Sequence, residues 1–178
     1  MADTLPQGLA QLLETPEPPE LGPHSRPGVL GQKALDARLD VIFNHLHLAD
    51  ESRQLVRALV LLWHDHLEAA HTLAQEVETA DGSFVHAIMH RREPDFSNSK
   101  YWWHRVGRHD CFQEIAQRVK DLLISKGETQ LSAKLIPNGN WDPMAFVEVC
   151  AKASPDDKLL REIQRIEFEV LLDHLRQQ

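Results

Sequence analysis

The chain has 178 residues with 27 acidic and 19 basic side chains, which gives a formal net charge of −8. This excess of negative charge argues against nucleic acid and against an anionic membrane surface as partners. Apolar residues make up 42% of the sequence, which is typical of a globular protein, and the length suits one domain. The longest apolar run covers residues 58–63, far short of the roughly 20 residues that a membrane-spanning helix needs.

The N-terminal sequence and the cysteines bear on the compartment in which the protein works. The chain begins with no basic segment and no apolar signal core, so we expect a cytoplasmic location. Cys111 and Cys150 are its two cysteines, each within a helical pattern. We therefore expect no disulfide framework.

Residues 1–30 are predicted to form an N-terminal arm that precedes a single domain of residues 31–178. The first part of the arm, Thr4 to Glu14, has leucines at the spacing of a short helix. Two roles are open for these leucines: they pack on the domain, or they stay free for a partner, including a second copy in a homodimer. The rest of the arm is predicted to be an extended connector, because prolines fix φ and remove backbone donors. The connector contains Pro16, Pro18, Pro19, Pro23 and Pro27.

From residue 31 onward, apolar residues recur at three- and four-residue steps, as in amphipathic helices. The stretch 50–63 is apolar on most sides and is therefore predicted to lie in the centre of a bundle. Residues 128–140 lack helical spacing and are predicted to be a loop with room for one short strand. The sequence thus predicts an all-α domain of packed antiparallel helix hairpins. The other predicted helices cover residues 35–46 and 83–93, or start at Asp110 with Gln113 as a capping box, at Asp142-Pro143, and at Ser154-Pro155 with an end near Arg176.

A weak internal repeat lies between two helical stretches about 30 residues apart. Asp65 and Asp95 start the two corresponding segments, and the small residues Ala69 and Ser99 follow four positions later. Over residues 55–106 this pattern resembles the middle of a tetratricopeptide repeat, in which an Asp stands at the turn and a small residue lets the helices approach. The resemblance implies helix hairpins and not the function of that family, since the spacing is shorter than the family's roughly 34 residues.

The segment from His86 to Trp102 reads His-Ala-Ile-Met-His-Arg-Arg-Glu-Pro-Asp-Phe-Ser-Asn-Ser-Lys-Tyr-Trp. It resembles the signature H-x-x-x-H-R-R-E-x-D-x-x-N-x-x-Y-W of a small family of bacterial and fungal helical proteins, and the likeness extends over residues 35–119. The activity of that family is unassigned. The resemblance therefore implies a helical fold and marks this segment, but it gives no residue a catalytic role.

Three polar residues on the helix predicted over 83–93 form a compact row. His86, His90 and Glu93 stand at positions i, i+4 and i+7, opposite the apolar side. Two imidazoles at this spacing can reach one divalent transition metal, and the carboxylate one turn on completes a set of three ligands. His64 or His71 could supply a further ligand. The alternative is a solvated polar face with no ligand at all.

Arg91 and Arg92 have two alternative roles, because the helical wheel places Arg92 within the apolar arc and Arg91 at its edge. A buried arginine needs a carboxylate, so Arg92 is predicted to join two hairpins by an ion pair with Asp65, Glu68 or Asp95. The other role is an anion pocket in which His90 is a neighbouring hydrogen-bonding group.

Two functions follow from these residues. The preferred hypothesis is a binding module without a cofactor, which takes an anionic small molecule or an acidic segment of a partner protein. The alternative is a metal-dependent, hydrolase-like enzyme with His86 and His90 as metal ligands and Glu93 as ligand or base. Trp103 is predicted to lie in the core, so that its neighbours Tyr101 and Trp102 cannot both do so. The predicted ligand-binding residues are His90, Arg91, Arg92, Asp95, Asn98, Tyr101 and Trp102.

Overall fold

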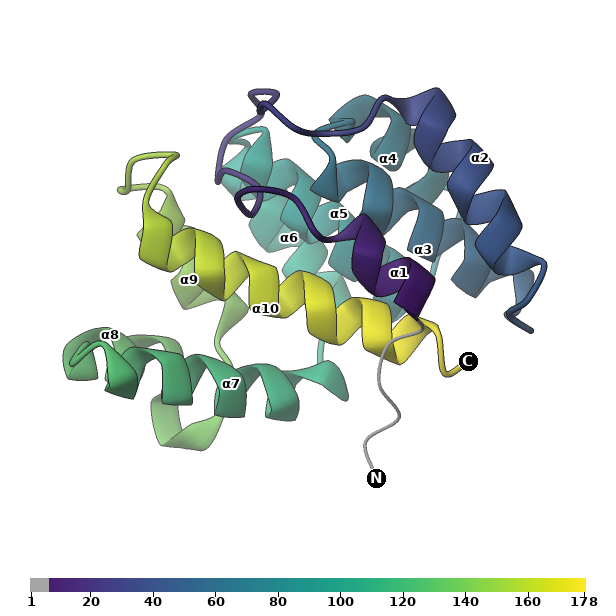
Figure 1. The fold of residues 1–178 in the computed structure, drawn as a ribbon. Helices are drawn as coiled ribbons and strands as arrows, with labels where there is room; N and C mark the ends of the chain where they lie inside the picture. The colour runs from purple at the N-terminus through teal and green to yellow at the C-terminus, as the bar shows by residue number, and fades with distance from the viewer. Residues whose placement is uncertain (1–6) are drawn as a thin grey trace.

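The computed structural model describes residues 7–178, and this part of the chain is helical without a strand (Figure 1). The predicted all-α fold class is confirmed. The helices are α1 (Gln7–Leu12), α2 (Gln32–Phe43), α3 (Asp50–Trp63), α4 (Leu67–Ala74), α5 (Ala80–Arg92), α6 (Phe96–Val106), α7 (Cys111–Ser125), α8 (Thr129–Leu135), the 3₁₀ turn η1 (Pro137–Gly139), α9 (Pro143–Cys150) and α10 (Lys158–Leu175).

Helix α3 is the centre of the bundle, as its sequence predicts. Every residue from Leu55 to Trp63 except Arg57 is buried. The long helix α10 packs against α3 on one side and α7 on the other, while α4, α5 and α6 follow α3 as successive neighbours (Figure 1). The ring of Trp63 meets Phe168 of α10 edge to face, with centroids 5.4 Å apart.

The N-terminal arm packs on the domain. Leu9 and Leu12 of α1 are buried, which confirms the first of the two predicted roles for the leucines; Thr4 and Leu5 lie outside the described residues. The proline-rich connector provides mainly carbonyl acceptors, because proline has no N–H. Side chains of α10 donate hydrogen bonds to these carbonyls. The Gln164 amide, for example, donates to the carbonyls of Pro19 and Glu20, each over 3.1 Å. The connector is thus fixed to the core through its own backbone.

Helix α5 starts at a point that only glycine fits. The Thr79 hydroxyl caps the helix by accepting from the backbone N–H of Gly82 over 3.2 Å. A Cβ at Gly82 would lie 2.0 Å from the carbonyl oxygen of Val77, so a larger residue would push the α4–α5 connection away. This close approach sets where the histidines of α5 lie relative to α4.

Two of the predicted elements need correction. Residues 129–135 form α8 instead of a loop with a strand, because a seven-residue helix is too short to show a helical period. Helix α10 starts at Lys158, where the Asp157 carboxylate caps the backbone N–H of Leu160, and not at Ser154-Pro155. The predicted start of α7 at Asp110 is confirmed, but the Asp110 side chain accepts no capping bond, so the predicted capping box does not form.

Candidate functional site

The two neighbouring arginines of α5 are completely buried, with 0% exposure each. Arg92 pairs with Asp65 over 2.8 Å and also donates to backbone carbonyls of α3 and of the arm, including Glu20 at 3.0 Å. Burial lowers the pKa of Arg92 to about 10, so the guanidinium is still charged at neutral pH. The predicted ion pair with Asp65 is confirmed; Glu68 and Asp95 are not its partners.

Arg91 enters the core toward α10. Its guanidinium pairs with Glu167 of α10, donates to the side-chain oxygen of Gln164 over 3.3 Å, and lies 4.5 Å from the centroid of the Phe146 ring. Arg91 and Arg92 therefore link helices through protein partners, although the buried Nε of Arg91 has no hydrogen-bond partner among the described residues. An anion could not reach either of them in this structure, so a site for an anionic ligand needs another cation.

Asp65 lies at the turn between α3 and α4 and receives two guanidinium groups. One carboxylate oxygen accepts from Arg92, and the other accepts from the side chain and the backbone N–H of Arg26, both at 2.9 Å. The backbone of Asp65 is left-handed, with φ of 67°. Such a conformation is costly for a residue with a Cβ, so the surrounding contacts must stabilise it.

The histidines of α4 and α5 form the histidine cluster, which we define as His71, His86, His90, Asn98 and Trp102. The ring of His71 lies edge-on to both His86 and His90, with centroids 5.2 and 5.4 Å apart. His86 stacks on the indole of Trp102 at 4.0 Å with an angle of 11° between the planes. The structure thus brings the predicted residues His86, His90, Asn98 and Trp102 together. It also places His71 of α4, one of the two further histidines named from the sequence, beside His86 and His90.

His86 and His90 each have one ring nitrogen fixed by a hydrogen bond. The Nδ1–H of His86 donates to the carbonyl of Gly82 over 3.1 Å, and Nδ1 of His90 lies 3.1 Å from the Glu93 carboxylate. Burial lowers the pKa of His86 to about 4 and also lowers that of His90, so both rings are neutral at pH 7. The Asn98 amide lies 3.2 Å from Nε2 of His90, whereas the buried Nε2 of His86 has no partner.

The donor atoms of His86, His90 and Glu93 do not form a group of three within 4.8 Å of one another. The rings of His86 and His90 are stacked, with centroids 6.1 Å apart, and Glu93 is engaged with His90. Among the described residues, a single group of at least three His, Cys, Asp or Glu side chains has donor atoms within 4.8 Å of one another, and it consists of His109, Cys111 and His174. His64 does not supply the further ligand in this structure, because its two ring nitrogens are hydrogen-bonded to the backbone of Leu12 and Leu30. A metal at His86, His90 and Glu93 stays a prediction.

Helix α6 presents a face that we call the α6 face, made of Asn98, Tyr101, Trp102 and Arg105. These positions follow the i, i+3, i+4, i+7 spacing of one helix side. Tyr101 is 53% exposed, and the guanidinium of Arg105 lies 5.3 Å from the Trp102 centroid and 6.0 Å from that of Tyr101. Asp95 caps the start of α6 by accepting from the N–H of Asn98 over 3.1 Å.

Arg105 is the cation of the site that the sequence did not single out. It is exposed, and no carboxylate of residues 7–178 pairs with it. The sequence could have indicated Arg105, because its spacing from Asn98 and Trp102 places the three residues on one side of a helix. Arg91 and Arg92 are thus buried, whereas Arg105, one helix further along the chain, is exposed.

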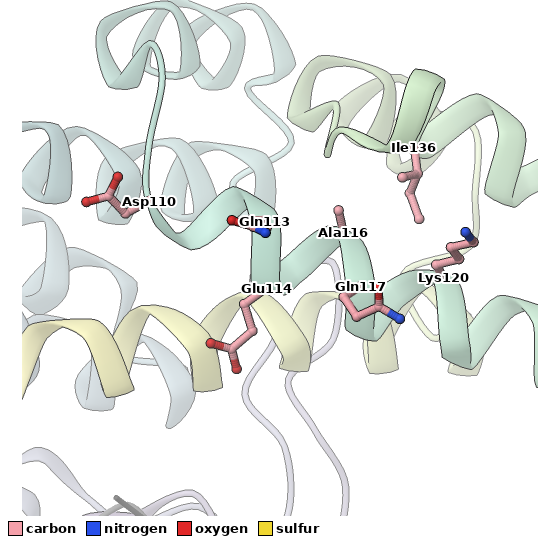
Figure 2. A pocket seen from close by; sticks show the side chains of 8 residues that line it. Asp110, Gln113, Glu114, Ala116, Gln117, Lys120 and Ile136 are labelled. Carbon is pink, nitrogen blue, oxygen red and sulfur yellow. The ribbon is translucent and has the colours of Figure 1, made fainter. Parts of the chain in front are cut away.

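None of the described cavities is lined by a residue of the histidine cluster, although one is lined by Glu93, which contacts His90. One of about 640 Å³ lies beside α7, between polar side chains of this helix and Ile136 (Figure 2). Another, of about 630 Å³, borders the α3–α4 turn and is lined by Glu68 and Glu93. Carboxylates at its wall make this second cavity unsuited to an anion.

No protein-family model, no curated protein and no solved structure matches this chain. The fold and the site thus define the protein as an all-α protein with a buried arginine network and an exposed aromatic–arginine helix face. None of the helices in the described range is long and apolar enough to cross a membrane.

Proposed function

We propose that the protein is a binding module that takes an acidic segment of a partner protein on the α6 face. The observation that carries this proposal is the exposed guanidinium of Arg105, which lies against Trp102 and Tyr101 without a carboxylate partner among the described residues. Tryptophan, tyrosine and arginine are the residues enriched at the energetic centres of protein interfaces.

The histidine cluster holds the Trp102 side chain of the α6 face in place. Trp102 stacks on the neutral ring of His86, which is itself tied to the backbone of α5. An aromatic side chain that is already held in place loses little conformational entropy when a partner binds. The described cavities lie elsewhere, which favours an extended segment over a small molecule on this face.

The charges at the two ends of α6 differ in sign and would orient a bound acidic partner segment along this helix. Glu93 and Asp95 stand at the start of the helix, while the exposed Arg105 and Arg108 stand at its end. An acidic stretch is attracted to the C-terminal end of α6 and repelled from the other end. The partner residues that lie near Asp95 are therefore expected to be neutral or basic.

A charge reversal tests the proposal. A library of displayed random peptides is selected on the wild-type protein, on Arg105→Glu and on the matched control Arg38→Glu, which changes an exposed arginine of α2. We expect acidic peptides from the wild type and the control and basic ones from Arg105→Glu. Arg105→Ala should weaken a selected peptide by about tenfold or more. Peptides that bind Arg105→Glu as well as wild type contradict the proposal.

A second candidate function rests on the free Nε2 of His86. Histidines that bind metals commonly donate their other N–H to a carbonyl or a carboxylate, as His86 and His90 do here. A metal-dependent hydrolase would use these two rings as ligands, with Glu93 orienting His90. Elemental analysis of the untagged protein and melting curves with zinc, nickel and manganese test this function: a near-equimolar metal lost in His86→Ala supports it, and unchanged melting without metal contradicts it.

A further inference from the structure

Side chains from two distant parts of the chain meet beside the start of α7. His109 and Cys111 lie at the start of this helix, and His174 comes from the last turn of α10. One donor atom of each lies within 4.8 Å of the donor atoms of the other two. Cys111 is buried, while the side chains of His109 and His174 are 5% and 27% exposed. The group is thus largely removed from bulk water but not sealed.

Asp81, in the first turn of α5, holds the two imidazoles. Its Oδ1 lies 2.8 Å from Nε2 of His109 and 3.1 Å from Nε2 of His174. The backbone N–H of Cys111 donates to Nδ1 of His109 over 3.2 Å, which identifies Nδ1 as the unprotonated nitrogen of that ring. A carboxylate that accepts from one nitrogen of an imidazole is the usual arrangement around a metal-binding histidine. The lone pair of His109 Nδ1 accepts from the backbone N–H of Cys111, so a metal bound to this nitrogen would replace that hydrogen bond.

The chemistry of the donors selects the metal. Two imidazoles and a thiol suit zinc, which prefers nitrogen and sulfur ligands and accepts three protein ligands with one open position. A cavity of about 120 Å³ is lined by Cys111 and His174 together with the carboxylates of Asp110, Glu114 and Asp173. A second cavity, of about 620 Å³, is lined by His109, Phe112 and Trp141. These cavities give an ion and a fourth ligand access, and the carboxylates attract a cation.

We propose that His109, Cys111 and His174 bind a zinc ion, with Asp81 orienting the two imidazoles. Zinc bonds to the sulfur as thiolate, and the proton of the Cys111 thiol passes to water. Because the ligands come from both α7 and α10, the ion would join these two helices. The site shares no residue with the α6 face or with the histidine cluster, so it stands independently of the proposed function.

Cobalt(II) substitution tests the site, since a cobalt–thiolate bond gives a charge-transfer absorption band that imidazole ligands alone do not. The untagged full-length protein, stripped of metal by a chelator, is titrated with cobalt and then with zinc. We expect a thiolate band that saturates at one ion per chain and that zinc removes. The band should persist in Cys150→Ser and in His86→Ala, which alter the other cysteine and the other histidine group.

Three variants make the test decisive. Cys111→Ser should lose the band, and Asp81→Asn should weaken cobalt binding by roughly 10- to 100-fold. His174→Ala changes a partly exposed side chain, so it keeps the test valid if Cys111→Ser does not fold; it should also weaken binding by at least about tenfold. Absence of the band in the wild type, or a band that survives in Cys111→Ser or is unaffected in His174→Ala, overturns the proposal.

Discussion

The buried charges of Arg91 and Arg92 determine how several helices of this protein are joined. The guanidinium of Arg92 is kept charged in the core by one carboxylate and by backbone carbonyls, and that of Arg91 by Glu167 and an aromatic ring. Removing one member of such a pair leaves the other charge buried without compensation. The polar residues of the α5 signature therefore divide into structural arginines and a separate cluster of neutral histidines.

Arg92→Ala is expected to lower the free energy of unfolding by about 3–5 kcal/mol, because Asp65 loses a partner in the interior. Arg92→Lys should recover only part of this loss, since an ammonium group cannot reach Asp65 and the carbonyls with the same fork of donors. Urea unfolding measures both, and Arg105→Ala is the matched control with a change within about 0.5 kcal/mol. Equal stability of the Ala variants at positions 92 and 105 contradicts the structural role of Arg92.

His86 makes stability depend on pH. Burial lowers its pKa from 6.5 to about 4, so between these values the unfolded chain binds a proton that the folded protein does not. The free energy of unfolding must therefore fall as the pH is lowered from 6.5 toward 4, by about 2–3 kcal/mol from this residue. Urea unfolding of wild type and His86→Phe at pH 7 and pH 4.5 checks this: the variant, which retains His71 and His90, should lose less. An equal loss in both proteins would show that His86 does not titrate this way.

At the scale of residues, the sequence predicted the ion pair of Arg92 because the partner Asp65 belongs to the adjacent hairpin. It did not reveal Glu167, which lies far along the chain from Arg91. A signal was present, since Glu167 stands on the apolar side of α10 with Ile163 and Val170. A carboxylate in an apolar stripe requires a buried cation, but the sequence does not say which cation. The meeting of Asp81, His109 and His174 likewise depends on how α5, α7 and α10 pack.

The helices in which the apolar pattern extends over many residues could be predicted from the sequence. Helix α3 was recognisable as the central helix because its apolar residues surround it, and the Asp142-Pro143 start of α9 is confirmed by the Asp142 carboxylate capping the N–H of Ala145. Short elements such as α8 were missed because they contain fewer than two full turns. The contact of the connector with α10 could not be predicted, since it runs through backbone carbonyls that carry no sequence pattern.

Arg161 of α10 is expected to keep the connector closed, because its guanidinium donates to the carbonyl of Pro18 and pairs with Glu17 at 3.0 Å. Loss of these bonds should raise the population of the locally open arm by about tenfold. Limited digestion with a protease that cuts after glutamate reports this opening at the bond between Glu20 and Leu21. Arg161→Ala should be cut correspondingly faster, whereas Arg165→Ala, on the exposed side of α10, should be cut like wild type; equal rates for all three proteins contradict the prediction.

Considered as a whole molecule, the chain folds around contacts that link its first residues to its last helix. The arm, α3, α5 and α10 share one polar network through Asp65, Arg92 and Gln164, and α1 adds Leu9 and Leu12 to the common core. The α6 face and the group at the start of α7 follow each other closely in the sequence, and both depend on this frame for their positions.

Deleting residues 1–28 is expected to destabilise the remaining chain strongly. The deletion exposes the surface that Leu9 and Leu12 cover, and removes both Arg26 from Asp65 and the carbonyl acceptors of Arg92. Burial of two leucines alone contributes about 3–5 kcal/mol. Circular-dichroism melting of the full chain and the truncated chain measures the loss; a truncated protein that melts cooperatively at the same temperature would show that the arm is dispensable.

The turn at Asp65 makes opposing demands on a single position. Its left-handed backbone favours glycine or asparagine, while the guanidinium groups of Arg26 and Arg92 require a negative charge that neither residue has. Aspartate meets both demands, and glutamate, with a longer side chain, does not meet the first. Homologous sequences that keep this fold should therefore retain aspartate at the turn, and any lineage that loses it should change positions 26 and 92 as well, so that the three sites evolve as one unit.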